Sequence, residues 1–278
     1  MNQRERFLAC MGYQPVDHVP DREFGYWDDT FRRWHAEGLP EEIDNNTVAD
    51  PFFGFERTMT VPSHVGLHPG FPGEIMEETD DYQILQDGEG VKKIIYKDGT
   101  DTIPRYLEFP IKDRASWEQF RERLRIDDPA RYRDDWDEIA RRTREADCPV
   151  QIGCGSLFGR LRNFIGFEGI ALMAYDDPVL LEEMIEHMCR LVCAVIEPAV
   201  RTCRIDMGAF WEDINFKQGC IISPRMFHAW LTPRYQRITD LVYSAGATMC
   251  YVDSDGNITD SIDGWLDGGV SCMFPVEV

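Results

Sequence analysis

Four carboxylates stand where two apolar segments of this sequence end, and their positions suggest acid–base chemistry. Asp253 and Asp255 close the run ATMCYVDSD, and Glu212 and Asp213 close RIDMGAFWED. Carboxylates just beyond a buried strand lie where open α/β sheets and (β/α) barrels keep their active sites. Two such pairs facing one cleft would raise each other's proton affinity and could act as a general acid and a general base. We therefore predict that these four residues form a catalytic cluster.

The acids around Gly256 also resemble a calcium-binding EF-hand loop, but the outer ligand positions do not fit. With Gly256 at the sixth position of such a loop, Tyr251 is first and Ile262 is twelfth. An EF-hand takes an oxygen ligand at the first position and a bidentate glutamate at the twelfth. The structural alternative for the two aspartates is that one caps the following helix and one is solvated. For Glu212 and Asp213 the alternative is pairing with arginines.

The elements that must position these carboxylates alternate between strand and helix in the second half of the chain. The β-prone segments CPVQIGCG, RIDMGAFWED, TMCYVDSD and VSCMFPVEV are separated by helical patterns, among them SPRMFHAWLTPRYQRITDLVYSAG. Such alternation implies a parallel sheet. No GxGxxG follows a strand, which argues against a nucleotide-binding fold. The pattern favours an α/β fold of the (β/α)8 TIM-barrel type, formed as a single domain over residues 1–278.

Two features depart from a plain barrel. Residues 71–111 alternate in hydrophobicity and carry Asp-Gly pairs at 87–88 and 98–99, which predicts a β-meander inserted as an excursion from the barrel. Helices are expected at about 113–125 and 130–146. The last strand, GVSCMFPVEV, has no helix after it, although parallel strands are buried on both faces. We expect C-terminal barrel units to be missing, either because the polypeptide is short or because a partner chain, as in a homodimer, closes the gap.

Charge and composition limit the partners and the compartment. The chain has 29 Lys and Arg against 50 Asp and Glu, a formal net charge of −21. Nucleic acids and anionic membranes are bound mainly through Lys and Arg, so this charge argues against both as partners. No run approaches the roughly 18 apolar residues of a membrane span, and the charged start MNQRERFLAC is not a signal peptide. Nine cysteines without a CxxC pair predict reduced thiols and a cytoplasmic protein.

Several motifs, in order over nearly the whole chain, resemble the uroporphyrinogen decarboxylase superfamily. They are NQRERFLACMGYQPVDHVP, GSLFGRLRNF, FWEDINFKQGCIISPRMFHAWLTPRYQRI and VDSDGN, of which the third is the most specific. The resemblance implies a (β/α) barrel with a cleft at the C-terminal ends of its strands. It also implies one of two chemistries: decarboxylation of uroporphyrinogen without a cofactor, or methyl transfer to or from corrinoid proteins, often with zinc.

Departures from the family pattern bear on that choice. The decarboxylases carry an arginine-rich motif where this chain reads DREFGYWDD, with Arg22 as the arginine of that stretch. One guanidinium cannot neutralise several buried carboxylates. The tyrosine expected after GSLF falls on Asn163. The His-x-Cys zinc pair of the methyltransferases reads Asp253-Ser254-Asp255, so the thiolate ligand is absent and the site suits harder cations than zinc. Whether a metal binds is left open by the sequence.

Further residues could contact a substrate. Arg160, with Arg162, could present a guanidinium to an anionic substrate or a corrinoid tail, and pairing with neighbouring acids is the alternative. The aromatic segment after the first predicted strand could stack on a flat ligand or pack in the core. No histidine has the metal-ligand spacing HxH or HExxH. The predicted substrate-binding residues are Arg22, Glu23, Tyr26, Arg160, Asn163 and Asn257.

These observations lead to an enzyme of the uroporphyrinogen decarboxylase family. We expect methyl transfer that involves a corrinoid (cobalamin) or a corrinoid protein, with the four carboxylates positioning or protonating a small-molecule substrate. Decarboxylation of uroporphyrinogen or a related tetrapyrrole is the alternative. A non-catalytic protein that binds a corrinoid or another small molecule is a third hypothesis, because the catalytic motifs of both branches of the family are missing.

Overall fold

A parallel sheet forms the centre of the protein, and its strands follow one another in chain order. The computed structural model describes residues 1–97 and 104–276. The order of the sheet is β1-β6-β7-β10-β11, with every neighbouring pair parallel. Because all five strands run in the same direction, their carboxyl ends meet at one edge. The strands are β1 (Met59–Val61), β6 (Val150–Gly153), β7 (Met207–Trp211), β10 (Met249–Asp253) and β11 (Cys272–Phe274).

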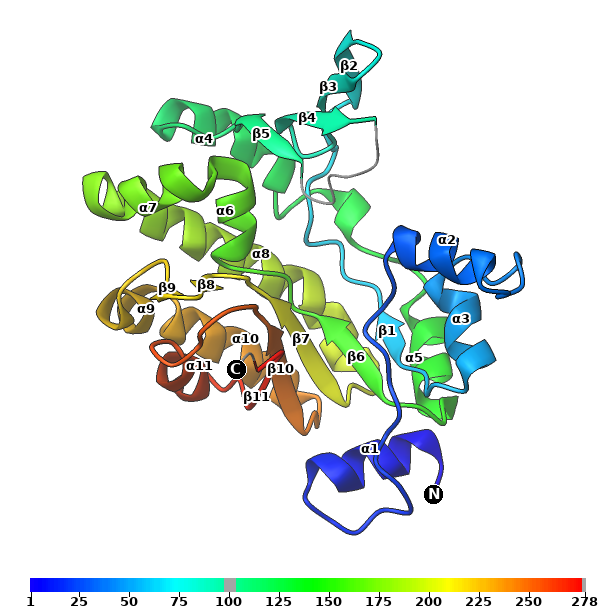
Figure 1. Cartoon of the computed structure of the whole chain (residues 1–278). Helices are drawn as coiled ribbons and strands as arrows, with labels where there is room; N and C mark the ends of the chain where they lie inside the picture. Colours follow the sequence, from blue (N-terminus) through cyan, green and yellow to red (C-terminus); the bar gives the residue numbers. More distant parts are fainter. Residues whose placement is uncertain (98–103, 277–278) are drawn as a thin grey trace.

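The other elements surround this sheet (Figure 1). The helices are α1 (Gln3–Met11), α2 (Asp28–Ala36), α3 (Asn46–Phe53), α4 (Arg114–Arg121), α5 (Trp136–Glu145), α6 (Gly159–Ile165), α7 (Phe167–Asp176), α8 (Pro178–Thr202), α9 (Pro224–Trp230), α10 (Thr232–Ser244) and α11 (Ile262–Asp267). The antiparallel strands are β2 (Glu74–Glu78), β3 (Tyr82–Gln86), β4 (Lys92–Tyr96) and β5 (Arg105–Glu108), with the short pair β8 (Asn215–Phe216) and β9 (Gly219–Cys220).

Helix α1 covers one face of the parallel sheet at the beginning of its strands. Phe7 packs against Met207 and Met249, the first residues of β7 and β10. The Arg4 guanidinium donates hydrogen bonds of 2.8–3.1 Å to the carboxylate of Asp206, which is buried. These contacts fix α1 at the amino ends of the strands. On the same face of the sheet, α1 therefore does not cover the carboxyl ends of the strands.

A four-stranded antiparallel sheet, in the order β2-β3-β4-β5, lies within residues 71–111, where the β-meander is predicted. Its first Asp-Gly turn is closed by Asp87, whose Oδ1 accepts hydrogen bonds from the amides of Glu89 (2.9 Å) and Val91 (3.1 Å). The second Asp-Gly pair, at 98–99, lies outside the described residues. In Figure 1 this sheet projects at the top of the view, at the opposite end of the molecule from α1.

The α/β prediction is confirmed, whereas a closed barrel is not shown. Over the described residues the parallel sheet is open, since β1 and β11 are each paired on one side only. The predicted helix SPRMFHAWLTPRYQRITDLVYSAG is interrupted, with α9 ending at Trp230 and α10 beginning at Thr232. Pro233 explains the break, because it lacks the amide hydrogen that a continuous helix would use. Gly166, with a φ of 84°, likewise separates α6 from α7.

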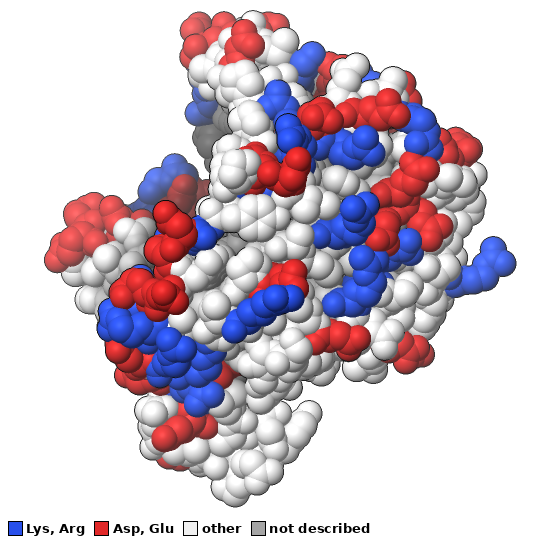
Figure 2. Space-filling view, turned by 180° about the vertical axis from the view of Figure 1, so that it is seen from behind, with Lys and Arg blue, Asp and Glu red and all other residues white. Residues whose placement is uncertain are grey.

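The surface carries both signs of charge. On the face shown in Figure 2, Lys and Arg side chains are interspersed with Asp and Glu, and no single basic surface dominates that face. Within the part of the chain that the structure describes, no helix is long and apolar enough to cross a lipid bilayer.

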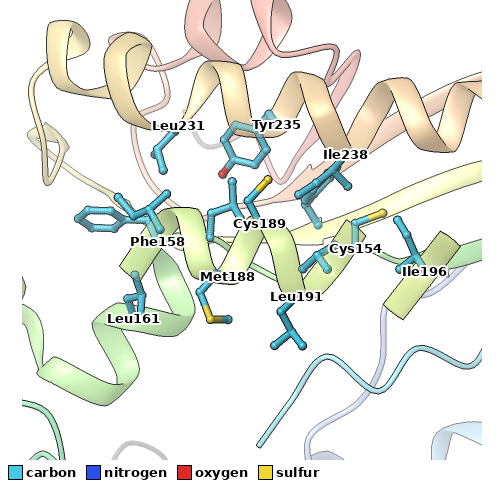
Figure 3. Close-up of a cluster of buried hydrophobic side chains, with 14 of the residues drawn as sticks. Cys154, Phe158, Leu161, Met188, Cys189, Leu191, Ile196, Leu231, Tyr235 and Ile238 are labelled. Atoms are coloured by element: carbon cyan, nitrogen blue, oxygen red, sulfur yellow. The ribbon is translucent and has the colours of Figure 1, made fainter. Parts of the chain in front are cut away.

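The hydrophobic core lies between the parallel sheet and helices α8 and α10. Alternate strand residues point to this side and are buried: Val61, Ile152, Phe210 and Val252. Figure 3 shows part of this cluster, in which Cys189 of α8 lies near Tyr235 and Ile238 of α10. Full burial of one large apolar side chain contributes about 1.5–3 kcal/mol, so this layer holds the strands and their carboxyl ends in place.

Candidate active site

Three of the predicted carboxylates meet at the carboxyl ends of β7 and β10. One ligand oxygen from each of Asp213, Asp253 and Asp255 lies within 4.8 Å of the others. The two strands are neighbours, with Trp211 beside Asp253 in the register, so residues just past their ends come together. Asp213 has a φ of 45°, in the left-handed region that Asp tolerates better than most residues. Its Oδ1 accepts a 3.2 Å hydrogen bond from the Asp255 amide, which ties the two strand ends together.

Burial and repulsion between neighbouring carboxylates make Asp253 and Asp213 easier to protonate than ordinary aspartates. Burial, followed by the charges of Asp213 and Asp255, raises the pKa of Asp253 to about 6. Burial also raises the pKa of Asp213, against the opposing effects of the Asp255 amide and Arg162. A carboxyl group with such a pKa is divided between its acid and base forms near neutral pH, as a general acid or base requires. The three side chains also offer the oxygen ligands that hard divalent cations take, and this set contains no sulfur ligand.

Glu212 does not join this cluster, because its side chain turns into the interior of the protein. The residue has no exposed surface, and its carboxylate accepts four hydrogen bonds of 2.6–3.1 Å. The donors are the amides of Leu157, Phe158 and Gly159 and the hydroxyl of Ser156. Burial raises the pKa of Glu212, and the amide hydrogen bonds oppose that shift. Its contacts hold the start of α6 against the end of β7, which is a structural role, and the catalytic role of Glu212 stays a prediction.

A cavity of about 820 Å³ opens beside Asp213, between the antiparallel sheet and helices α6 and α7. This volume falls in the range of roughly 300–1,000 Å³ that is typical of small-molecule sites. Polar groups of the cavity wall include Arg162, Asn163 and Asp213. Its aromatic wall consists of Tyr106, Phe109, Phe167, Trp211 and Phe216. The cavity and the carboxylate cluster therefore share Asp213 and together form one candidate site.

Arg162 connects the cavity to the carboxylate cluster. Its Nη1 donates a hydrogen bond to the backbone oxygen of Asp213, and its Nη2 donates one of 3.2 Å to Oδ1 of Asn163. The guanidinium also lies over the ring of Trp211, 5.5 Å from its centroid. Arg162 thus links the Asp213 backbone, Asn163 and Trp211. It also orients the side chain of Asn163, one of the predicted substrate-binding residues, in the cavity wall.

Two other predicted substrate-binding residues lie outside the cavity wall. Arg160 forms an ion pair with Glu89, which links α6 to the turn between β3 and β4. This pairing with an acid is the structural alternative considered for that residue. Asn257 is exposed in the turn after β10, where its Oδ1 accepts a 3.0 Å hydrogen bond from the Thr259 amide. Arg160 and Asn257 therefore shape the surroundings of the site.

The three N-terminal candidates are also not among the residues that line the cavity. Arg22 lies over the ring of Phe7, 4.9 Å from its centroid, near α1. Glu23 accepts a 2.7 Å hydrogen bond from the amide of Phe24. Tyr26 packs edge-on among aromatic residues of α2 and α3, the core-packing alternative considered for it. None of the three belongs to the cavity wall.

Sequence reasoning missed most of the aromatic wall. Trp211 had a usable signal, since it alternates with Asp213 and so shares its side of the strand end. Phe109 and Phe167 come from segments that meet only in the folded protein. The Phe109 ring packs directly on Gly166, the neighbour of Phe167, so closely that a Cβ atom at Gly166 would lie 2.4 Å from the ring. No local pattern in the sequence reports that contact.

Comparisons with known proteins indicate a fold. A scan against protein-family models and a search of curated protein sequences gave no match. Among solved structures, the protein is similar to a methyltransferase from Methanosarcina mazei, with a TM-score of 0.57 and 15% sequence identity. The similarity covers 98% of this chain and 75% of that chain. At this identity it shows that the two proteins share an α/β fold.

Proposed function

We propose that this protein is a methyltransferase that acts on a small molecule at the cluster of Asp213, Asp253 and Asp255. The observation that carries the proposal is the position of this cluster, at the carboxyl ends of β7 and β10 and at the wall of a cavity of substrate size. The shared fold with a methyltransferase supports it. Membership in the uroporphyrinogen decarboxylase superfamily, with its (β/α) barrel, belongs to the same proposal, and the consecutive order of the parallel strands is in keeping with it.

Asp253 is the residue best suited to move a proton in this reaction. When a methyl group leaves an oxygen or nitrogen atom, the bond to carbon breaks and the departing heteroatom keeps the electron pair. Asp253, whose pKa is about 6, would donate a proton to that atom while the acceptor takes the methyl group. Asp213 and Asp255 would keep the proton on Asp253 through their negative charge.

The cavity fits the smaller methyl substrate better than it fits a corrinoid. Its volume of about 820 Å³ suits a drug-sized molecule, so a corrinoid would have to be presented at its mouth by a partner protein. When bound there, the corrinoid would supply the cobalt that accepts or donates the methyl group. A thiolate zinc site of the family type does not fit, because the strand-end residues offer only carboxylate oxygens.

Charge favours methyl transfer over decarboxylation of a tetrapyrrole. The cavity wall contains the carboxylates of Asp87, Glu89, Glu168 and Asp213. Its cations are Lys93, which pairs with Asp87 at 2.9 Å, and Arg162, which is held by the Asp213 backbone. A substrate with several carboxylates would meet repulsion here without enough guanidinium groups to offset it.

The test uses cob(I)alamin as methyl acceptor under anaerobic conditions, with methanol, methylamines and aryl methyl ethers as donors. Formation of methylcobalamin is followed by absorbance. We expect transfer from at least one donor, and a rate at least about 100-fold lower in Asp253→Asn, the usual effect of losing a general acid. Asp263→Asn, an exposed carboxylate on α11, serves as the matched control and should keep the full rate.

A parallel incubation with uroporphyrinogen, with products resolved by carboxyl number, separates the alternatives. Stepwise loss of carboxyl groups without any methyl transfer would replace the proposal by decarboxylation. Donor binding without turnover in either assay would make the protein a non-catalytic binder.

A further inference from the structure

The aromatic wall of the cavity is unusual because much of it is exposed to solvent. Phe167 is 55% exposed, Tyr106 is 51% exposed and Phe216 is 40% exposed, and all three line the same cavity. Soluble proteins rarely gather large apolar side chains in one exposed concave place unless something binds there. The cavity therefore has the features of a binding site whose ligand supplies the missing apolar contacts.

The aromatic side chains are held in defined orientations by one another. Phe167 and Phe216 meet edge to face, with ring centroids 5.0 Å apart and planes at 70°. Tyr106 and Phe109 lie 5.7 Å apart, at 36°. Ring pairs at such distances favour insertion of a further flat ring over that of a flexible chain, because stacked and edge-to-face contacts need a planar partner.

The antiparallel sheet is anchored over the cavity by contacts that are distant in sequence. Ile111 donates a 3.1 Å backbone hydrogen bond to Phe164 at the end of α6. Gly166 lets the Phe109 ring approach the backbone where any side chain would collide with it. Together with the ion pair between Arg160 and Glu89, these contacts make the aromatic wall a built part of the fold.

The charges in the wall select against anions. Asp87 is paired with Lys93 and Glu89 with Arg160, which leaves Glu168 and Asp213 to face the single charge of Arg162. The local balance is one negative charge, and the chain as a whole carries −21. Exposed aromatic faces also attract cations through their quadrupoles.

We propose that this cavity binds a planar aromatic ligand that carries a positive charge or none, with its polar end directed toward Asp213. Its role as a methyl substrate rests on the proposed function, because the cluster of Asp213, Asp253 and Asp255 then lies at the polar end of the ring. The binding of this ligand does not rest on the proposed function, and it is measured without any methyl acceptor.

The test is isothermal titration calorimetry with three matched probes of the same ring: 4-methoxybenzylammonium, 4-methoxybenzyl alcohol and 4-methoxybenzoate. We expect the ammonium probe to bind about tenfold more tightly than the benzoate at low ionic strength, with the alcohol between them. Cyclohexylmethylammonium, which keeps the charge and lacks the flat ring, should bind about fivefold more weakly than the ammonium probe.

Two substitutions on α7 locate the site. Phe167→Ala should weaken binding of the ammonium probe about fivefold, whereas Tyr175→Ala, which removes a 70% exposed aromatic side chain outside the cavity, should leave it unchanged. Both positions are exposed, so both variants should fold, which circular dichroism checks. Phe216→Ala provides a second variant in the wall.

Three results would overturn the inference: equal affinity for benzoate and ammonium probes, unchanged affinity in both wall variants, or no binding of any probe at millimolar concentration. Ring binding without methyl transfer would count against the proposed function alone. Methyl transfer from a non-aromatic donor, without ring binding, would count against this inference alone.

Discussion

Replacing Glu212 by Gln tests whether this strand-end carboxylate supports the structure or takes part in the chemistry. In the folded protein its Oε2 accepts hydrogen bonds from Ser156, Phe158 and Gly159, and its Oε1 accepts one of 2.7 Å from the Leu157 amide. A glutamine can keep the first three with its amide oxygen. Its NH2 group then faces the Leu157 N–H, so that this buried amide loses its acceptor.

A buried donor without a partner costs about 1–3 kcal/mol, and the loss of charge-assisted bonds to the remaining amides adds to that. Removing a buried charge offsets part of the loss. We therefore expect Glu212→Gln to lower the free energy of unfolding by about 2–3 kcal/mol.

The assay is urea denaturation at pH 7, followed by tryptophan fluorescence and circular dichroism. Glu197→Gln removes a half-exposed glutamate paired with Arg201 on α8 and should change stability by less than about 0.5 kcal/mol. A Glu212→Gln variant as stable as the wild type would refute the structural reasoning. Unchanged stability combined with lost activity would return Glu212 to the catalytic group.

Three further predictions concern the same region. Asp253→Asn should raise the free energy of unfolding by about 1 kcal/mol at pH 8 and leave it unchanged at pH 4. The reason is that the pKa of Asp253 in the folded protein, about 6, lies above its ordinary value. The wild type therefore loses stability as the pH rises from about 4 to about 6, and partial exposure of the carboxylate screens the full effect. Urea midpoints at the two pH values check this. If Asp253 donates the proton, kcat/KM should fall about tenfold per pH unit above about pH 6, and this slope should vanish in the Asn variant. Gly159→Ala would place a carbon 1.9 Å from the Glu212 backbone oxygen and should cost about 3 kcal/mol in urea denaturation, whereas Gly169→Ala, which meets only a methyl group of Ile165 at 2.9 Å, should change stability by less than about 1 kcal/mol.

The grouping of Asp213, Asp253 and Asp255 followed from the sequence because it depends on short-range facts. Each residue comes just after an apolar run, and parallel strands bring such positions to one edge. The same reasoning grouped Glu212 with these residues, whereas its side chain is buried in the interior. The alternation of side chains along a strand could have predicted this difference. Glu212 shares its side with Phe210, which is buried toward the helices, while Trp211 and Asp213 point the other way.

The rest of the site depends on contacts between distant segments, which no local pattern encodes. The placement of the antiparallel sheet over the cavity rests on pairs such as Glu89 with Arg160 and Phe109 with Gly166. Tyr26 shows that a residue type alone does not decide between two roles. An aromatic residue after a strand can stack on a ligand or pack in the core, and only its neighbours in the folded protein distinguish the two.

The docking of α1 has a consequence for the order in which the protein can be assembled during synthesis. Arg4 and its partner Asp206 are 202 positions apart, and Phe7 rests on Met249. During synthesis the apolar side of α1 must therefore stay uncovered until β10 has been translated. Contacts of such long sequence separation form late, and an uncovered apolar surface is a target for chaperones and for aggregation in the meantime.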